Sequence, residues 1–389
     1  MSNARHIVHL AKYYPPTPGG IETAVQTLAR AQVRCGLSVT VICLTDPDEP
    51  RAGGLIEETD AGVRILRVRP GLNVYKLALS MQVVRLIQTL SCQPGTVLHL
   101  HTPNPTMILA LATAGISAPL VIMHHSDIIR QRVLRLGTAP LDRYVYGRAA
   151  QVQATNPRYV EGSRTLQRCG GRLRVLPLGL DLSRLVDPSA EARAARDRWR
   201  STLGEPLWLC VGRLVYYKGL STAIAALPRM PGRLLIVGSG PLRGELERQV
   251  SGLGLSDRVV FAGQAGDDDL VGAYHAATAL LLPSNARSEA FGLVQVEAMA
   301  CGCPVVNTDI AGSGVPWVSV HEQTGLTVAV GDAGALAAAA GRLVTEAGLR
   351  ERLSAAAVRR AREEFSDWVM AQRSVALYEQ VLASPKERR

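Results

Sequence analysis

Short runs of β-branched residues and leucine alternate with helix-like patterns along the whole chain. Strands of a parallel sheet are buried on both faces, so they appear as short, nearly continuous apolar runs separated by crossover helices. Helical spacing of apolar residues marks segments such as 21–35 and 74–90. The alternation predicts an α/β fold built on parallel sheets. The predicted strands are residues 6–10, 38–44, 63–68, 97–101, 120–124, 151–155 and 174–176, then 207–211, 234–237, 259–261, 279–282, 305–307 and 326–328.

The alternation pauses near residues 178–181, where a polar, arginine-rich stretch at 187–204 follows. We place the linker there. A length of 389 residues favours two domains, which we expect at residues 1–180 and 181–366. Each is expected to be a doubly wound, Rossmann-like sheet, and the two to face each other across a cleft. A helix over residues 367–385 is expected to pack back on the first domain.

Composition and the N-terminal segment indicate a cytoplasmic protein, and we expect no resident cofactor. The chain is 47% hydrophobic, and its first residues lack the apolar region of a signal peptide. The charge-free run 104–126 is long enough to span a membrane, but Gly115, Ser117 and Pro119 interrupt it. Seven cysteines show no zinc-ligand spacing, so we expect reduced thiols and no metal.

The excess positive charge is concentrated in residues 128–174, where ten arginines accompany Asp142 and Glu161. Such a stretch indicates attraction to an anionic lipid surface, a pyrophosphate or a nucleic acid, or else an ordinary solvated face. Nucleic acid is disfavoured because 4% of residues are aromatic and no stacking motif is present. Apolar residues among the arginines favour docking on an anionic membrane, with Arg130, Arg132 and Arg135 as candidates.

Two carboxylates, Glu289 and Glu297, stand eight positions apart in the second half of the chain. If a helix begins around Phe291, Glu297 lies inside it and Glu289 in the preceding loop. Unpaired N–H groups at Phe291, Gly292 and Leu293 would then attract a phosphate. A phosphate-binding helix start between two acids suits a nucleotide sugar. Glu297 would accept hydrogen bonds from ribose hydroxyls, and Glu289 from hydroxyls of the transferred sugar. The alternative is a helix with ordinary solvated glutamates.

Three other loops follow predicted strands and carry glycine or basic residues. Gly20 opens a helix after the first strand, and Gly238 with Gly240 form a similar turn, which would allow a phosphate or sugar to approach closely. The alternative at Gly20 is an ordinary strand-to-helix turn. A nicotinamide site is disfavoured, because the acid about 20 residues on, Asp257, precedes its strand. Arg213 and Lys218 are candidate clamps for a diphosphate, although surface loops often carry such charges by chance.

Two further motifs contain titratable residues. His125 follows the strand 120–124, where a histidine can donate to a sugar hydroxyl or to developing charge, and Asp127 could orient it. The alternative is a structural histidine. Asp267–Asp269 is similar to a metal-binding acidic triplet, but it opens a helical pattern. N-cap and first-turn acids explain it better than a metal.

Taken together, these motifs resemble the retaining GT-B glycosyltransferases of family 4, in that family's order and over nearly the whole chain. The resemblance implies that Arg213 and Lys218 bind the diphosphate and that Glu297 holds the ribose. It implies that Glu289, with the backbone of Phe291, Gly292 and Leu293, grips the donor sugar, and that His125 lies beside it. It also implies that the first domain faces the acceptor and that no metal is needed. The motifs are Gly19-Gly20, His125, Gly212-Arg213, Lys218-Gly219, residues 237–241, Glu289 to Leu293, residues 297–306 and residues 324–326.

The segments 125–131 and 313–318 look like a bacterial subgroup that builds surface polysaccharides. The expected activity is therefore the retaining transfer of a mannose-, galactose- or glucose-type hexose from a GDP- or UDP-linked donor. The acceptor would be a lipid-linked saccharide, used at the inner face of the cytoplasmic membrane. Two alternatives remain: a nucleotide-sugar epimerase of the same fold, and a basic membrane-binding module without catalysis.

Overall fold

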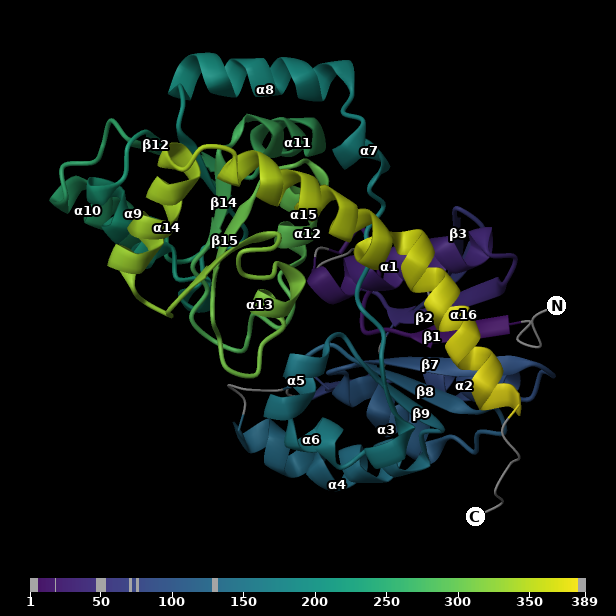
Figure 1. Cartoon of the computed structure of the whole chain (residues 1–389). Helices are drawn as coiled ribbons and strands as arrows, with labels where there is room; N and C mark the ends of the chain where they lie inside the picture. Colours follow the sequence, from purple (N-terminus) through teal and green to yellow (C-terminus); the bar gives the residue numbers. More distant parts are fainter. Residues whose placement is uncertain are drawn as a thin grey trace. The chain divides into compact units, whose positions relative to one another are not determined.

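The computed structural model describes residues 6–17, 19–46, 54–69, 72–74, 77–127 and 132–383, without the side chains of 72–74, 77–79 and 132–138. The chain forms two compact units (Figure 1). Unit 1 comprises Met1–Gly179 and Asp367–Arg389, and unit 2 comprises Leu180–Ser366. Each unit contains its own large sheet, so each is described separately.

Unit 1 is built on an eight-stranded sheet in the order β10-β9-β8-β7-β1-β2-β4-β3. All neighbouring strands pair in parallel except β3, which is antiparallel to β4. Its strands are β1 (His6–Leu10), β2 (Ser38–Leu44), β3 (Leu55–Asp60), β4 (Val63–Val68), β7 (Thr96–Thr102), β8 (Leu120–His124), β9 (Gln151–Ala154) and β10 (Leu173–Val175). Its helices are α1 (Gly20–Arg34), α2 (Met81–Ser91), α3 (Pro105–Thr113), α4 (Arg132–Arg148), α5 (Pro157–Gly162), α6 (Arg164–Gln167), the 3₁₀ turn η1 (Gly170–Arg172) and α16 (Asp367–Ala383).

The structure adds local elements to unit 1 that the apolar pattern did not predict. The strand β3 is largely polar, because it lies at the sheet edge and its side chains stay exposed or half-buried. A two-stranded antiparallel sheet of β5 (Leu72–Val74) and β6 (Leu77–Leu79) precedes α2. The predicted helix over 74–90 is therefore wrong in its first part, and α2 begins at Met81.

Helix α16 packs on α1 although residues 180–366 separate it from the rest of unit 1 (Figure 1). Tyr378 of α16 is fully buried in an apolar cluster with Val25 and Ala29 of α1. Arg34 at the end of α1 also forms an ion pair with Asp367 at the start of α16. The helix is thus part of the core of unit 1.

Unit 2 is built on a six-stranded parallel sheet in the order β13-β12-β11-β14-β15-β16. Its strands are β11 (Leu207–Val211), β12 (Arg233–Val237), β13 (Val259–Gly263), β14 (Ala279–Leu282), β15 (Val305–Thr308) and β16 (Gly325–Val328). Its helices are α7 (Ser183–Val186), α8 (Ala190–Leu203), η2 (Tyr216–Lys218), α9 (Leu220–Ala226), η3 (Leu227–Arg229), α10 (Arg243–Gly252), α11 (Asp267–Ala276), α12 (Leu293–Ala300), α13 (Val315–Val318), α14 (Ala333–Thr345) and α15 (Leu349–Phe365). The two parallel sheets confirm the predicted α/β class.

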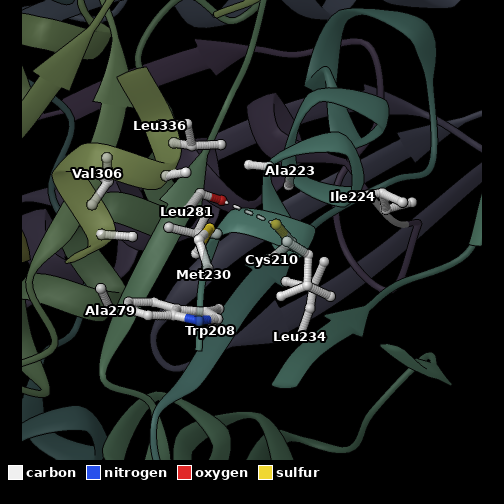
Figure 2. Packing of buried hydrophobic residues seen from close by; sticks show 14 of the residues in the cluster. Trp208, Cys210, Ala223, Ile224, Met230, Leu234, Ala279, Leu281, Val306 and Leu336 are labelled. Carbon is white, nitrogen blue, oxygen red and sulfur yellow. Dashed lines mark hydrogen bonds between the residues drawn. The ribbon is translucent and has the colours of Figure 1, made fainter. Parts of the chain in front are cut away.

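The core of unit 2 fills the space between its sheet and the covering helices (Figure 2). Trp208 of β11 is fully buried, and its Nε1 donates to the carbonyl of Pro231 at 2.7 Å. Beside it, the thiol of Cys210 points at the carbonyl of Leu281, 3.3 Å away (Figure 2). Strands β11 and β14 are therefore packed tightly at the centre of the sheet.

The polar stretch 187–204, predicted as the linker, is mostly helix α8. Ser189 caps it by accepting a hydrogen bond from the Ala192 N–H at 3.0 Å. The helix packs on α11 so closely that a Cβ added to Gly272 would lie 2.7 Å from the Ala195 Cβ. The sequence suggested a linker because the stretch is polar and its packing partner, α11, is far away in the chain; Arg198 of α8, for example, pairs with Asp269 of α11.

The turns after β11 and β12 pack so closely that only glycine fits at two positions of the second turn. Gly238 has φ +135°, and a Cβ added there would lie 2.1 Å from the carbonyl oxygen of Gly212. A Cβ on Gly240 would lie 2.5 Å from the carbonyl oxygen of Leu214. The close approach that we expected of these glycines is thus an approach to another turn of the same unit.

We expect Gly238→Ala to destabilise unit 2 by about 2–4 kcal/mol, because it combines a left-handed backbone with a collision against a carbonyl. Gly244→Ala is the matched control: Gly244 lies in α10, and an added Cβ there has no neighbour within 4 Å. That change should leave stability unchanged or raise it by up to about 1 kcal/mol. Urea unfolding of both variants measures the difference, and equal effects would contradict this account.

Candidate functional site

The candidate site of unit 2 lies at the carboxyl edge of its sheet, between β11 and β14. The chain runs outward from β11 through β12 to β13, and outward from β14 through β15 to β16, so the strand order reverses between β11 and β14. Ligands of open α/β sheets bind at such a switch point. The turn 212–219 after β11 and the loop 283–292 after β14 meet there.

An ion pair between Lys218 and Glu289 joins these two loops. Lys218 Nζ lies 2.7 Å from Glu289 Oε2, and the two side chains are 11% and 10% exposed. The Ser284 hydroxyl also donates to Glu289 Oε2, at 3.2 Å. Burial lowers the pKa of Lys218, but the Glu289 carboxylate, together with Tyr217 and Glu297, outweighs burial, so the pKa of Lys218 is raised. Lys218 is therefore held as a cation at the switch point.

Backbone hydrogen bonds keep the loop after β14 in one conformation. The Asn285 N–H donates to the Tyr217 carbonyl at 2.8 Å, which ties this loop to the turn after β11. The hydroxyls of Thr308 and Ser313 donate to the carbonyls of Ser284 and Glu289, each at 2.5 Å. The ion pair thus sits on a rigid backbone, as a binding site requires.

The start of α12 offers unpaired donors beside this ion pair. Gly292 adopts a left-handed conformation, with φ +74°, and α12 begins at the next residue. Among the described residues, the N–H groups of Phe291, Gly292 and Leu293 have no hydrogen-bond acceptor. A helix start of this kind attracts anions. The helix begins within two residues of the predicted position.

Phe291 contributes more than its backbone. Its ring is buried and packs edge-on against Phe365 with a centroid distance of 5.7 Å, and Trp317 completes the cluster. Arg360 lies over the Phe365 ring, 5.3 Å from its centroid. The ring therefore anchors the loop to α13 and α15.

Glu297 lies one turn into α12 and is partly buried. The Tyr274 hydroxyl of α11 donates to its Oε2 at 2.5 Å. Burial raises the pKa of Glu297, although Tyr274 and Lys218 partly oppose that shift. The ionised carboxylate is thus costly here, and a ligand that donates hydrogen bonds to it would offset the cost.

Arg213 provides an unpaired cation at the same edge. Its side chain is exposed, and within the described residues it forms no ion pair. It lies on the turn whose other end carries Lys218. The turn can therefore present one exposed and one buried cation to an anionic ligand.

In unit 1, Gly20 begins α1 as expected, but a neighbouring carboxylate occupies the space beside that helix start. A Cβ added to Gly19 would lie 2.0 Å from Glu22 Oε2. Burial raises the pKa of Glu22. A phosphate at this helix start would have to displace the Glu22 side chain.

His125 follows β8, and its neighbours differ from those expected. Its Nε2 lies 2.9 Å from His101 Nδ1, whereas Asp127 lies beside His124, with 3.3 Å between Oδ1 and Nε2. Asp127 therefore cannot be the residue that orients His125. Burial lowers the pKa of His125 to about 3, and His124 adds to that effect.

The remaining candidates divide into residues outside the description and residues engaged in structure. Arg130 is outside the described residues, and the side chains of Arg132 and Arg135 are not described. Of the aspartate triplet, Asp267 and Asp268 pair with Arg184, and Asp269 pairs with Arg198. The triplet lies in the first turn of α11, as expected, while Gly266 rather than an acid is the N-cap.

The structure brings together several residues that the sequence analysis missed. Three buried histidines, His9, His99 and His101, have ring nitrogens within 4.8 Å of one another, close enough to consider a metal ion. The signal was available, because His99 and His101 alternate along one predicted strand and therefore share a face. Ser284 and Tyr274 gave no comparable signal, since their partners Glu289 and Glu297 are not identifiable as such from spacing.

Comparisons with known proteins define the class. The model of the family described as "Glycosyltransferase Family 4" matches residues 18–184, and that of "Glycosyl transferases group 1" matches residues 192–360. The chain matches the structure of sucrose-phosphate synthase from Thermosynechococcus elongatus with a TM-score of 0.76 at 25% identity, over 97% of this chain and 99% of that one. It matches the structure of Anabaena HepE in complex with UDP with a TM-score of 0.76 at 20% identity, over 96% of this chain and 100% of that one. The fold is GT-B, and the protein is a glycosyltransferase.

Two curated relatives narrow the class. The chain is 33% identical over 326 residues to D-rhamnosyltransferase WbpZ of Pseudomonas aeruginosa, covering 83% of this chain and 82% of the relative. It is 28% identical over 379 residues to O-antigen chain mannosyltransferase C of Escherichia coli, covering 97% and 99%. The chain belongs to the group 1, family 4 glycosyltransferases, as the resemblance predicted.

We expect a strong coupling between Lys218 and Glu289. Glu289→Gln leaves a buried cation without its partner and should cost about 3–5 kcal/mol of folding free energy. In a double-mutant cycle, Lys218→Met together with Glu289→Gln should cost about 1–3 kcal/mol less than the two single changes combined. The exposed pair Arg243–Glu247 is the control, and its coupling should not exceed about 1 kcal/mol. Additive effects at the buried pair would show that the two charges do not depend on each other.

Proposed function

We propose that this glycosyltransferase moves a hexose of the mannose type, with retention of configuration, from a nucleoside diphosphate donor to a saccharide acceptor. The observation that carries the proposal is the Lys218–Glu289 ion pair at the switch point of unit 2, next to the unpaired N–H groups of α12. The choice of sugar is supported by the rhamnosyl- and mannosyltransferase relatives, since D-rhamnose is a deoxy form of mannose. Galactose- and glucose-type donors are the alternatives.

The donor diphosphate would lie against Arg213, Lys218 and the start of α12. Two of the three N–H bonds of the Lys218 ammonium remain for phosphate oxygens while the third points at Glu289. Glu297 would accept hydrogen bonds from ribose hydroxyls, which replaces water at a carboxylate that burial already disfavours. Glu289 and the backbone of Phe291, Gly292 and Leu293 would hold the sugar, near the bond that breaks.

The transfer breaks the bond between the anomeric carbon and the donor phosphate oxygen, and the nucleoside diphosphate leaves with the electron pair. The acceptor hydroxyl forms the new bond on the same face of the sugar, and its proton passes to the departing phosphate. Negative charge on the diphosphate is greatest in the transition state. Arg213 and Lys218 therefore stabilise that state more than the bound substrate.

The test is a panel of GDP- and UDP-linked hexoses, with nucleoside diphosphate release measured with and without a mannose-terminated acceptor and in the presence of EDTA. We expect acceptor-dependent release from a GDP- or UDP-linked hexose that EDTA does not abolish. Interconversion of the donor sugar without diphosphate release would identify an epimerase. Absence of both reactions, with no nucleotide binding, would favour a non-enzymatic module.

Glu297→Ala should weaken nucleoside diphosphate binding by about 1.5–3 kcal/mol, because the ribose loses a charged acceptor. Glu245→Ala, at an exposed position of α10, is the control and should bind as the native chain does. Isothermal titration calorimetry measures both. Unchanged affinity in Glu297→Ala would remove Glu297 from the donor site.

The free energy of unfolding of a second variant, Glu297→Gln, separates this binding effect from misfolding. Because burial raises the pKa of Glu297, its contribution to stability is present below the ordinary pKa of about 4.3 and is lost as pH rises through the folded value. Once ionised, the side chain thus opposes folding. Glu297→Gln, which keeps the acceptor for Tyr274, should be as stable as the native chain at pH 7 or more stable.

We further propose that the acceptor is lipid-linked and that the basic stretch 128–174 docks on an anionic bilayer at the cytoplasmic face. Ten arginines in that stretch support the proposal, each worth on the order of 1 kcal/mol near such a surface. Among the described helices, none is both long and apolar enough to cross a membrane.

Co-sedimentation with liposomes should show binding that rises with anionic lipid content and falls with salt. Arg130→Glu combined with Arg135→Glu should reduce that binding, whereas Arg243→Glu, in unit 2, should not. Binding that ignores lipid charge, or no binding, would make these arginines ordinary solvated surface and favour a soluble acceptor.

A further inference from the structure

A continuous hydrogen-bonded chain runs through the interior of unit 1 from His125 to α16. His125 Nε2 lies 2.9 Å from His101 Nδ1, and His101 Nε2 lies 2.9 Å from His9 Nδ1. His9 Nε2 continues to Gln32 Oε1 of α1 at 2.8 Å. The Gln32 amide then donates to Ser374 Oγ at 3.0 Å and to the Tyr378 hydroxyl at 2.9 Å, both in α16.

We expect the three histidines of this hydrogen-bonded chain to be neutral at pH 7, because burial disfavours the charged imidazolium form. His9 and His101 are fully or almost fully buried, and His125 is 6% exposed. Burial lowers the pKa of His9 to about 4 and that of His125 to about 3, and it lowers the pKa of His101 well below the ordinary value. A neutral imidazole has one donor nitrogen and one acceptor nitrogen. Fixing the role of one nitrogen therefore fixes the whole ring.

Ser374 determines the direction of the chain. Its hydroxyl lies 2.7 Å from the backbone carbonyl of Ala371, which can only accept, so the single proton of Ser374 is used there. Ser374 Oγ must then accept from Gln32, which places the Gln32 amide nitrogen toward α16 and its oxygen toward His9. In the opposite orientation two acceptor oxygens would face each other at the same 3.0 Å.

The direction passes from ring to ring. His9 Nε2 donates to the Gln32 oxygen, so His9 Nδ1 accepts from His101 Nε2. His101 Nδ1 in turn accepts from His125 Nε2. His125 Nδ1 is thereby left without a proton, and within the described residues it has no hydrogen-bond partner.

We propose that Gln32 and Ser374 are positioning residues that hold His125 in the Nε2-protonated tautomer, so that its Nδ1 presents a lone pair to a hydroxyl group. This reverses the role expected from the sequence, in which the histidine donates. The consequence for turnover rests on the proposed function, since the hydroxyl would belong to a sugar. The tautomer of His125 does not depend on that function.

A metal ion bound by His9, His99 and His101 is the competing explanation. His99 favours it, because its Nε2 has no partner among the described residues. Its Nδ1 lies 2.7 Å from the Tyr378 hydroxyl oxygen and would have to donate to that oxygen for Nε2 to bind a metal. The distance of 2.9 Å between His9 and His101 nitrogens argues against it. Two imidazoles on one tetrahedral zinc, each about 2.0–2.1 Å from it, would keep their nitrogens about 3.3 Å apart. The hydrogen-bonded chain uses both nitrogens of His9 and of His101, and a metal would have to break it.

The test is long-range proton–nitrogen NMR on the full chain with ¹⁵N-labelled histidine rings, assigned with single His→Gln variants. His9, His101 and His125 should each carry the proton on Nε2 at pH 7. Protonation of His125 on Nδ1, or a cationic His125, would overturn the proposal. So would a stoichiometric transition metal in the purified protein, measured by mass spectrometry.

Gln32→Met removes the acceptor at one end with little change in volume. The chain should then reverse, because a buried N–H without an acceptor is less tolerable than a bare ring nitrogen, and His125 should carry its proton on Nδ1. Gln88→Met, at an exposed position of α2, is the matched control and should keep the native tautomer. Ser374→Ala should give a mixture of both tautomers, and Ser374→Thr should restore one.

Turnover provides an independent readout. In Gln32→Met we expect kcat to fall about tenfold, the effect of one lost hydrogen bond, with KM changed less than about twofold. If the native tautomer persists in both Gln32→Met and Ser374→Ala, the positioning role is wrong. If the tautomer reverses but no nucleotide sugar is turned over, the positioning role stands and the proposed function fails.

Discussion

Every loop that follows a strand of a parallel sheet emerges at the same edge, and the functional geometry of this protein depends on that constraint. In unit 2 it places the turn after β11 beside the loop after β14, although about 70 residues separate them. The ion pair of Lys218 with Glu289 can form because of that placement. In unit 1 the same arrangement puts His125 after β8, next to the end of β7. The sheets bring these residues together, and the hydrogen bonds of the loops then fix their distances.

The Lys218–Glu289 pair of unit 2 and the hydrogen-bonded chain of unit 1 are two different kinds of buried polar arrangement. At the edge of unit 2 one buried cation is balanced by one buried carboxylate, with Ser284 as a second partner of Glu289. In unit 1 the hydrogen-bonded chain from His125 to α16 consists of imidazole, amide and hydroxyl groups that satisfy one another. A neutral chain avoids the desolvation cost of buried charge, but it requires each donor to meet an acceptor. The ion pair of unit 2 is suited to binding an anionic ligand, and the hydrogen-bonded chain of unit 1 is suited to keeping each proton on one nitrogen.

Most of the fold could be predicted from the sequence, because strands buried on both faces leave long apolar runs. The strands of unit 2 were found within two residues of their observed ends, and α12 began close to Phe291. The edge strand β3 and the helix α8 were missed, because their residues are polar and their partners are distant in the chain. The pairing of Lys218 with Glu289 was also missed: the two were placed on separate parts of a ligand. Spacing along the chain carries little information about contacts between loops of different strands. For the same reason Tyr274, Gln32 and Ser374 had no visible signal.

The position of α16 in the chain has a consequence for biosynthesis. A ribosome delivers residues 1–179 first, and domains generally fold as they emerge. Unit 1 remains without α16 until the whole of unit 2 has been made. During that interval Gln32 lacks Ser374 and Tyr378, and the apolar face of α1 lacks its cover. Nascent chains of this protein therefore carry an unfinished first unit for as long as it takes to translate 187 residues, Leu180–Ser366. That is the period in which a chaperone would have to shield it.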